Sequence, residues 1–292
     1  MKRIFVGTPL SFWLVCGVLL IYTGVMWLRT PNLARMWVYP TVRDITKLSV
    51  LHKARGLDVR ESEHFVIKYK PQDQASVQMV LDTAEEAYEP VTDSIGFKPP
   101  RKATIILVSS REEMQQEMGW SSGQSAMGVF WSGLIEVLAP QAWITDGDLD
   151  KQKEQFVKNG PMAHEFTHLV VDAATRGNYP RWFTEGLAQY QEYRLNGYEW
   201  ITSTNSLNQP LYSLAELERD FDGVENQSLA YRESFAAVRY MYAVYGDDGV
   251  RAVLSELNRG KTLPAALQKV CNMNYPQFEA AWQQWARQQM QP

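Results

Sequence analysis

Two histidines and one glutamate, His164, His168 and Glu165, stand in the short run HEFTH. On an α-helix, positions four apart lie on one face, so the two imidazoles would converge on one point. Glu165, about 100° further round the helix, would then face a water molecule bound at that point. The HExxH pattern therefore predicts a catalytic zinc ion with a carboxylate base beside it.

The surrounding sequence favours a helix through this motif and offers a third zinc ligand. Pro161 precedes the apolar-periodic stretch, where proline suits the first turn, and Gly177 follows it. A catalytic zinc takes three protein ligands and keeps a fourth position for water, so one more donor is needed. Glu185, 17 residues beyond His168, lies in a second helix that a proline begins. A helical hairpin would point its carboxylate back at the histidines.

The residues after the first motif carry a family resemblance. Trp182, Glu185, Gly186 and Ala188 form the pattern W-x-x-E-G-x-A. HExxH followed by this pattern resembles the gluzincin metallopeptidases, and most closely their bacterial peptidase-MA-like members. The likeness spans roughly residues 61–292. It implies an α+β, zincin-like catalytic domain with an α/β upper lobe and a helical lower lobe, one Zn²⁺ per chain, and peptide or protein substrates hydrolysed by a zinc-activated water.

Three further residues are candidates for the site. The segment that begins at Tyr231 resembles the tyrosine segment of the family, which implies that Tyr231 stabilises the oxyanion. Ligand histidines need a partner on the second ring nitrogen, and Asp172, one turn beyond His168, is placed to be one. Gln189, one turn after Glu185, is another candidate for this part.

Two other interpretations of the motif remain. The first is a catalytically idle zincin fold that binds a protein partner at the membrane, although a binding module has no need of Glu165. A structural zinc site is the second alternative, but such sites usually close the shell with four protein ligands and favour cysteine.

The composition is that of a globular protein without a nucleic-acid footprint. Of 292 residues, 45% are hydrophobic and 21% are charged, and the net charge is −4. This balance excludes a disordered chain and makes nucleic acid an unexpected partner. Cys16 lies in the apolar N-terminal stretch and Cys271 near the other end, so no internal disulfide is expected and the redox compartment stays open.

The N-terminal region predicts a membrane anchor. The run from Leu10 to Leu28 carries no charge, and at 1.5 Å per residue it is long enough to cross a hydrocarbon core of about 30 Å. A cleaved signal peptide is the alternative, but no small-x-small cleavage site follows the run. More basic residues follow the span than precede it, whereas a short Lys/Arg head before an apolar run begins many signal anchors. We expect a single-pass protein whose catalytic domain is extracytoplasmic.

The expected organisation is a tail at residues 1–9, an anchor at 10–28, a juxtamembrane linker at 29–60 and a metallopeptidase domain at 61–292. Within that domain, 61–175 would be the α/β lobe and 176–292 the helical lobe. Alternation and β-branched runs predict strands at 64–69 and 103–108 and a strand or hairpin within 125–138. Helical spacing predicts helices at 73–95, 114–118, 181–195, 214–221, 228–245, 248–257, 264–271 and 276–289 in addition to the zinc helix. The polar segment 146–158 is expected to be a loop or a helix.

Overall fold

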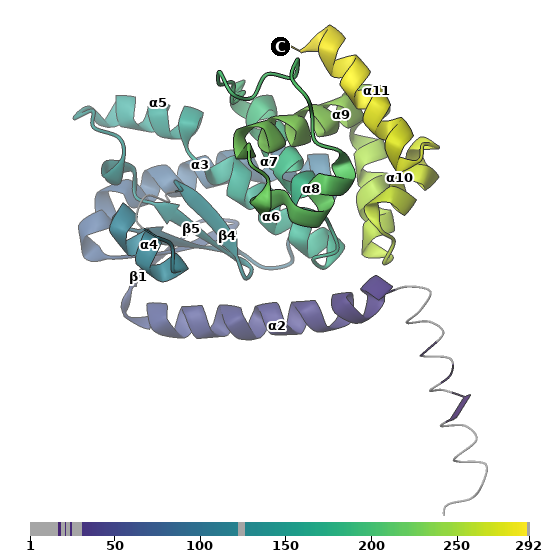
Figure 1. Cartoon of the computed structure of the whole chain (residues 1–292). Coiled ribbons are helices and arrows are strands. Elements are labelled where there is room, and N and C mark those ends of the chain that lie inside the picture. The colour runs from purple at the N-terminus through teal and green to yellow at the C-terminus, as the bar shows by residue number, and fades with distance from the viewer. Residues whose placement is uncertain (1–16, 19–20, 22–23, 25–30, 122–125, 291–292) are drawn as a thin grey trace, which may run out of the picture.

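The computed structural model describes residues 17–18, 21, 24, 31–121 and 126–290 (Figure 1). The strands are β1 (Asp58–Glu61), β2 (Phe65–Tyr69), β3 (Ala103–Val108), β4 (Gly128–Trp131) and β5 (Leu134–Leu138). The helices are α2 (Pro31–Lys53), α3 (Gln74–Ile95), α4 (Arg111–Met118), α5 (Leu149–Asn159), α6 (Met162–Thr175), α7 (Arg181–Asn196), α8 (Leu214–Asp220), α9 (Gln227–Asn258), α10 (Leu263–Cys271) and α11 (Tyr275–Gln289). This pattern is a mixed α+β fold in which helices predominate.

The five strands form one sheet in the order β1-β2-β3-β5-β4. The central pairs β2–β3 and β3–β5 are parallel, while β1 and β4 pair antiparallel with their neighbours. β3 is buried along its whole length, as its run of β-branched residues predicts for a central parallel strand. β4 lies at one edge of the sheet and turns into β5 as the expected hairpin.

Side chains of the central strands alternate between two apolar layers. Ile105 and Leu107 belong to the main core, which includes residues of α3 and α6, whereas Ile106 packs with residues at the end of α2. The period of two in this pattern places α3 and α6 on one face of the sheet and the end of α2 on the other. The helix that carries the HExxH motif is therefore seated directly on the sheet.

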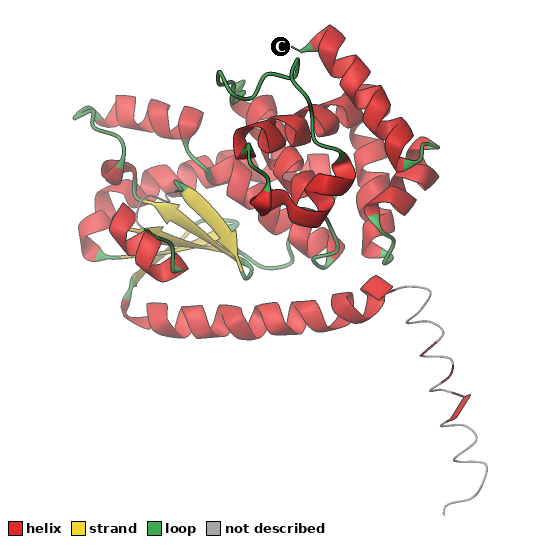
Figure 2. Cartoon of the chain, in the orientation of Figure 1, coloured by secondary structure: helices red, strands yellow, loops and turns green. Residues whose placement is uncertain are grey.

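The chain beyond α6 is helical, and Figure 2 shows these helices gathered beside the sheet. α7 packs closely against α9. A Cβ atom at Gly186 would lie 2.2 Å from the carbonyl oxygen of Ser234. Only glycine permits this approach, which explains why glycine follows Glu185. α9 is interrupted at Gly246, where the backbone is not helical (φ 66°, ψ −175°). The label α9 therefore covers two helical segments, as the helices predicted at 228–245 and 248–257 require.

The N-terminal helix α2 differs most from expectation. Residues 29–60 are expected to be a linker, yet 31–53 form a 23-residue helix and 58–61 form β1. Figure 1 shows α2 running along one side of the domain, past the sheet and towards α10. The predicted span, 10–28, lies almost wholly outside the described residues. Among the residues that are described, no helix is both long and apolar enough to cross a membrane.

Candidate metal centre

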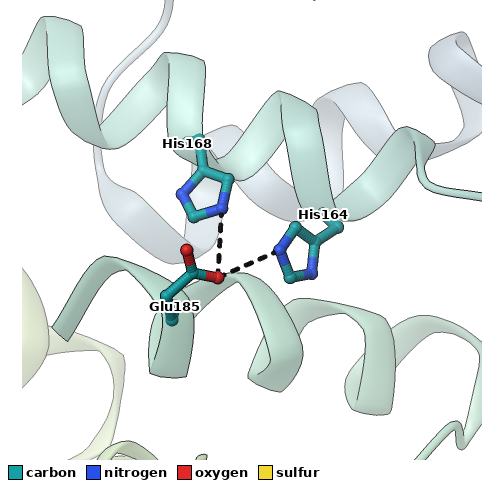
Figure 3. Close-up of side chains that lie close together, drawn as sticks. All are labelled: His164, His168 and Glu185. Carbon is teal, nitrogen blue, oxygen red and sulfur yellow. Dashed lines mark ion pairs between the residues drawn. The ribbon is translucent and has the colours of Figure 1, made fainter. Parts of the chain in front are cut away.

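Two adjacent helices bring three metal-ligand side chains to one point. His164 and His168 project from α6, and Glu185 projects from α7 toward both of them (Figure 3). Oε2 of Glu185 lies 3.3 Å from Nε2 of His164 and 3.5 Å from Nε2 of His168. α6 and α7 therefore form the helical hairpin that the sequence predicts.

These separations fit a tetrahedral metal ion. Two ligand atoms bound tetrahedrally at about 2.0–2.1 Å would lie about 3.3–3.4 Å apart. The two histidine-to-glutamate separations match that edge length, and one ligand atom from each of the three residues lies within 4.8 Å of the others. Two imidazoles and one carboxylate are a donor set that zinc accepts at catalytic sites. The residues present thus fit one such ion.

The other ring nitrogens have protein partners. Nδ1 of His164 lies 3.0 Å from Oε2 of Glu192, and Nδ1 of His168 lies 2.8 Å from the hydroxyl of Thr184. Both partners come from α7, the helix that also carries Glu185. A proton on each Nδ1 would leave both Nε2 atoms as electron-pair donors at the metal position.

The expectation that Asp172 orients a histidine ring is wrong. Its carboxylate is 1% exposed and accepts hydrogen bonds from Tyr39 (2.6 Å) and Tyr179 (3.2 Å). It also forms a 2.7 Å ion pair with Arg43. One further turn along α6 carries Asp172 past the ligand pair to the place where α2 contacts the domain, so this carboxylate holds α2 instead.

The carboxylates around the metal position favour positive charge there. Burial alone would lower the pKa of His164, but the charge of Glu192 and hydrogen bonds with Glu185 and Glu192 raise that pKa well above its ordinary value. Burial would raise the pKa of Glu185, yet the two histidines hold the pKa of this carboxyl well below its ordinary value. The site therefore keeps an ionised carboxylate in a buried position, as a cation requires.

Glu165 lies in the same cleft, against the edge strand of the sheet. Burial raises the pKa of Glu165, while the histidines and a hydrogen bond from the backbone N–H of Phe130 act to lower the pKa. β4 approaches closely here, because a Cβ atom at Gly128 would lie 2.8 Å from Cγ of Glu165 and 2.6 Å from Cβ of Pro161. The glycine thus lets the edge strand fix the position of the carboxylate.

Tyr231 lies in the first turns of α9 and lines the same cleft as the ligands. Burial and the charge of Glu185 raise the pKa of Tyr231, and a hydrogen bond with Arg181 opposes this rise in pKa. Arg181 also lies 3.4 Å from Oε1 of Glu185, the oxygen that is not shared with the histidines. Gln189 donates a 3.3 Å hydrogen bond to the carbonyl oxygen of Tyr231, so it positions the start of α9 and not a ligand histidine.

The cleft itself has a volume of about 1020 Å³. One wall is β4 with the turn that follows it, and the other walls are α6, α7 and the start of α9. Three residues of α2, namely Asn32, Arg35 and Tyr39, line one end of it. The cleft is large enough for a peptide and brings together all the predicted ligands.

An HExxH helix on a sheet, a carboxylate ligand from the next helix and a cleft along a sheet edge define a metallopeptidase site. The family model of the peptidase MA superfamily matches residues 83–288, from within α3 to the end of α11, and this chain belongs to that superfamily. No curated protein matches the chain. The superfamily supports a peptidase, and the group of His164, His168 and Glu185 supports metal dependence.

Proposed function

We propose that this chain is a membrane-anchored zinc peptidase of the gluzincin type that hydrolyses peptide bonds. The observation that carries the proposal is the spacing of three donor atoms. Oε2 of Glu185 lies at a tetrahedral edge length from both histidine Nε2 atoms, and Glu165 lies in the same cleft.

In this proposal the protein's own groups carry out the hydrolysis. When bound, Zn²⁺ supplies Lewis acidity, which makes a water molecule acidic enough to act near neutral pH and polarises the substrate carbonyl. Glu165 accepts a proton from the attacking water and returns it to the amine nitrogen as the C–N bond breaks. Tyr231 donates its phenolic hydrogen bond to the carbonyl oxygen as negative charge develops there. Glu192 and Thr184 hold the two histidine rings in orientation.

The edge strand offers a way to bind substrate independently of its sequence. β4 pairs with β5 on one side only, and its other side borders the cleft. An extended peptide laid along β4 would gain main-chain hydrogen bonds, while its side chains alternate between the cleft and solvent. The scissile bond would then pass beside Glu165, which Phe130 of the same strand contacts.

The location is part of the proposal. The uncharged run from Leu10 to Leu28 would anchor the chain as a single-pass protein, with the catalytic domain on the extracytoplasmic side. The remaining alternative is an idle zincin fold that binds a protein partner at the membrane. The buried position of Glu165 beside the three candidate ligands supports the enzyme.

The test combines metal content with cleavage of a mixed peptide library by the full chain in detergent micelles. We expect about one zinc per chain, and Glu165→Gln should keep the zinc while lowering turnover on the order of 10²–10⁴-fold. Glu154→Gln, an exposed change on α5, is the matched control and should match the wild type. Zinc without cleavage by the wild type would favour the binding module, and no zinc after repletion would refute the ligand assignment.

A further inference from the structure

One face of helix α2 contacts both the sheet and the helices of the domain. Leu33 at its start contacts Gly260, between α9 and α10. In its middle, Arg43 pairs with the buried carboxylate of Asp172 on α6. Further on, Lys47 donates a 3.1 Å hydrogen bond to the carbonyl oxygen of Gly133, in the turn between β4 and β5. α2 therefore contacts α6 and the β4–β5 turn, which both line the cleft, and also the connection between α9 and α10.

The opposite face of α2 is apolar and exposed. Five large hydrophobic side chains on it are 53% to 74% exposed: Trp37, Val38, Val42, Ile45 and Leu48. At about 100° per residue, these positions fall within an arc of roughly 140°. The residues that contact the domain, such as Met36 and Arg43, lie on the other side of the helix. A contiguous apolar stripe of this kind on a surface marks an interaction site.

Sequence position and charge indicate what covers the stripe. The uncharged run that ends at Leu28 stops two residues short of α2, and two residues span less than about 10 Å even when extended. Residues 31–56 contain five basic residues and one acidic residue. Arg43 and Lys47 contact the domain, which leaves Arg35, Lys53 and Arg55 exposed. Exposed Arg35 and Lys53 flank the stripe beside Val42. Basic charge around an apolar face suits anionic lipid headgroups, and it would repel a second copy of the same face.

We propose that α2 lies along a lipid bilayer surface, with the stripe from Trp37 to Leu48 inserted between headgroups and acyl chains. Its other face holds the catalytic domain, so the end of the cleft lined by Asn32, Arg35 and Tyr39 is about one helix diameter, ~10 Å, from the bilayer. If α2 lies there, the substrates are peptide segments at the membrane surface. This substrate assignment rests on the proposed peptidase function.

The position of α2 is measured with a fluorescent bimane on a single cysteine at Ile45. The full chain, with Cys16→Ser and Cys271→Ala, is reconstituted in vesicles of phosphatidylcholine and phosphatidylglycerol. A second protein carries the label at Gln284, an exposed residue of α11, which Figure 1 draws on the opposite side of the domain. Nitroxides on the upper acyl chain should quench the label at Ile45 several-fold more than the label at Gln284, and aqueous iodide should show the reverse order.

Two results would overturn the placement. Equal iodide quenching at Ile45 and Gln284 would mean that the stripe faces water. Protection from iodide without quenching by lipid nitroxides would mean that protein, such as a second copy, covers the stripe. Neither measurement needs peptidase activity, so failure of the proposed function would leave this test intact.

The substrate class has its own test. Ile45→Glu with Leu48→Glu removes apolar character from the stripe and leaves the cleft residues unchanged. Cleavage of a free peptide should equal that of the wild type, while cleavage of the same peptide tethered by a lipid to the vesicle surface should fall several-fold. Thr41→Glu with Ser49→Glu adds the same number of charges at exposed positions of α2 without loss of an apolar side chain, and is the matched control for added charge. An unchanged ratio of tethered to free cleavage in the double variant would refute the substrate assignment.

Discussion

The two nitrogens of each ligand histidine have different partners. Nε2 of His164 and of His168 faces Glu185, while Nδ1 faces Glu192 or Thr184. Because a neutral imidazole carries one proton, a hydrogen bond at Nδ1 decides that Nε2 is free to bind a metal. α7 thus carries one of the three candidate ligands, Glu185, and also the residues that contact the second nitrogen of the other two.

Replacing Glu192 should weaken metal binding without removing a ligand. Glu192→Ala leaves Nδ1 of His164 without its carboxylate, so both the tautomer and the ring orientation are less well fixed. Loss of such partners typically lowers metal affinity by ~10–100-fold. Glu192→Gln keeps an acceptor oxygen but loses the charge, and should fall between the wild type and the alanine variant. Zinc affinity is measured by competition with a chelator.

The matched control for Glu192 is Glu225→Gln, an exposed change in the loop before α9 that should leave zinc affinity unaltered. Equal zinc affinities for Glu192→Ala and the wild type would show that Glu192 is not a positioning residue for His164.

The sequence predicted which three side chains come together at the candidate metal centre but not the residues that contact the second histidine nitrogens. The HExxH motif predicts the relative positions of its side chains, because both histidines and Glu165 lie within two turns of one helix. Glu192 lies two turns beyond Glu185, so helical spacing was the available signal, but which ring nitrogen it meets depends on how α7 packs against α6. The same spacing argument predicted Asp172 as a histidine partner, but the carboxylate of Asp172 binds Tyr39 and Arg43 of α2.

At the scale of elements, the contact between α2 and α6 can be tested with two aspartates that share one arginine. Arg43 pairs with Asp172, which is 1% exposed, and with Asp44, which is 64% exposed. Asp172→Asn leaves Arg43 and two tyrosine hydroxyls around a neutral amide, and should cost on the order of 2–3 kcal/mol of unfolding free energy. Asp44→Asn should cost about 0–1 kcal/mol. Urea unfolding of the solubilised full chain measures both.

Equal losses from the two substitutions would show that the buried pair does not fix α2. A larger loss for Asp172→Asn should be accompanied by faster proteolysis within residues 31–53, because a helix released from the domain exposes its backbone.

The helix α2 was missed for a physical reason. Its docked face carries Tyr39, Arg43 and Lys47, and these polar residues do not mark a buried side in a sequence. Their partners Asp172 and Gly133 are distant in the chain, and the apolar residues of α2 mostly face outward. From its sequence alone, a helix whose buried face is polar therefore resembles a solvent-exposed linker.

The buried carboxyl of Glu233 on α9 predicts a pH dependence of stability. Burial, together with the negative charges of Glu279 and Glu216, raises the pKa of Glu233 from 4.5 to about 8. One oxygen accepts a hydrogen bond from the backbone N–H of Tyr212, and no described residue is a hydrogen-bond partner of the other oxygen. The folded state thus holds a proton that the unfolded chain has already released near neutral pH.

The sign follows from the raised pKa. Below pH 4.5 both states bind the proton, and stability is lost as the pH rises from about 4.5 to about 8, on the order of a few kcal/mol. Glu233→Gln keeps an acceptor for Tyr212 and should be more stable than the wild type at pH 8, with little difference at pH 4.5. Urea unfolding between pH 4.5 and 9 gives the difference, and Glu86→Gln on the surface of α3 is the control. If the difference in unfolding free energy between the wild type and Glu233→Gln does not change with pH, the pKa of Glu233 is not raised.

At the scale of the whole molecule, the cleft depends on three parts of the chain that are far apart in sequence. The sheet edge supplies β4, the helical hairpin supplies the ligands, and α2 contributes Asn32, Arg35 and Tyr39 at one end. The segment nearest the proposed anchor therefore belongs to the substrate cleft. α2 thus joins this segment to the cleft directly, through the residues that line it, and through the ion pair with Asp172 on α6.

The proposed anchor predicts how the whole chain behaves in membranes. An uncharged run of this length should stay with the membrane after alkaline carbonate and high-salt washes, because its release would expose the entire run to water. Leu19→Arg with Leu20→Arg places two charges near the centre of the run, each costing ~2.5–3.5 kcal/mol in a bilayer. That variant should be held only by the stripe on α2 and should be released by the washes, whereas Leu19→Ala with Leu20→Ala should stay bound. Fractionation followed by immunoblotting distinguishes the three proteins, and release of the wild type by carbonate would refute a spanning segment while leaving a surface-bound α2 intact.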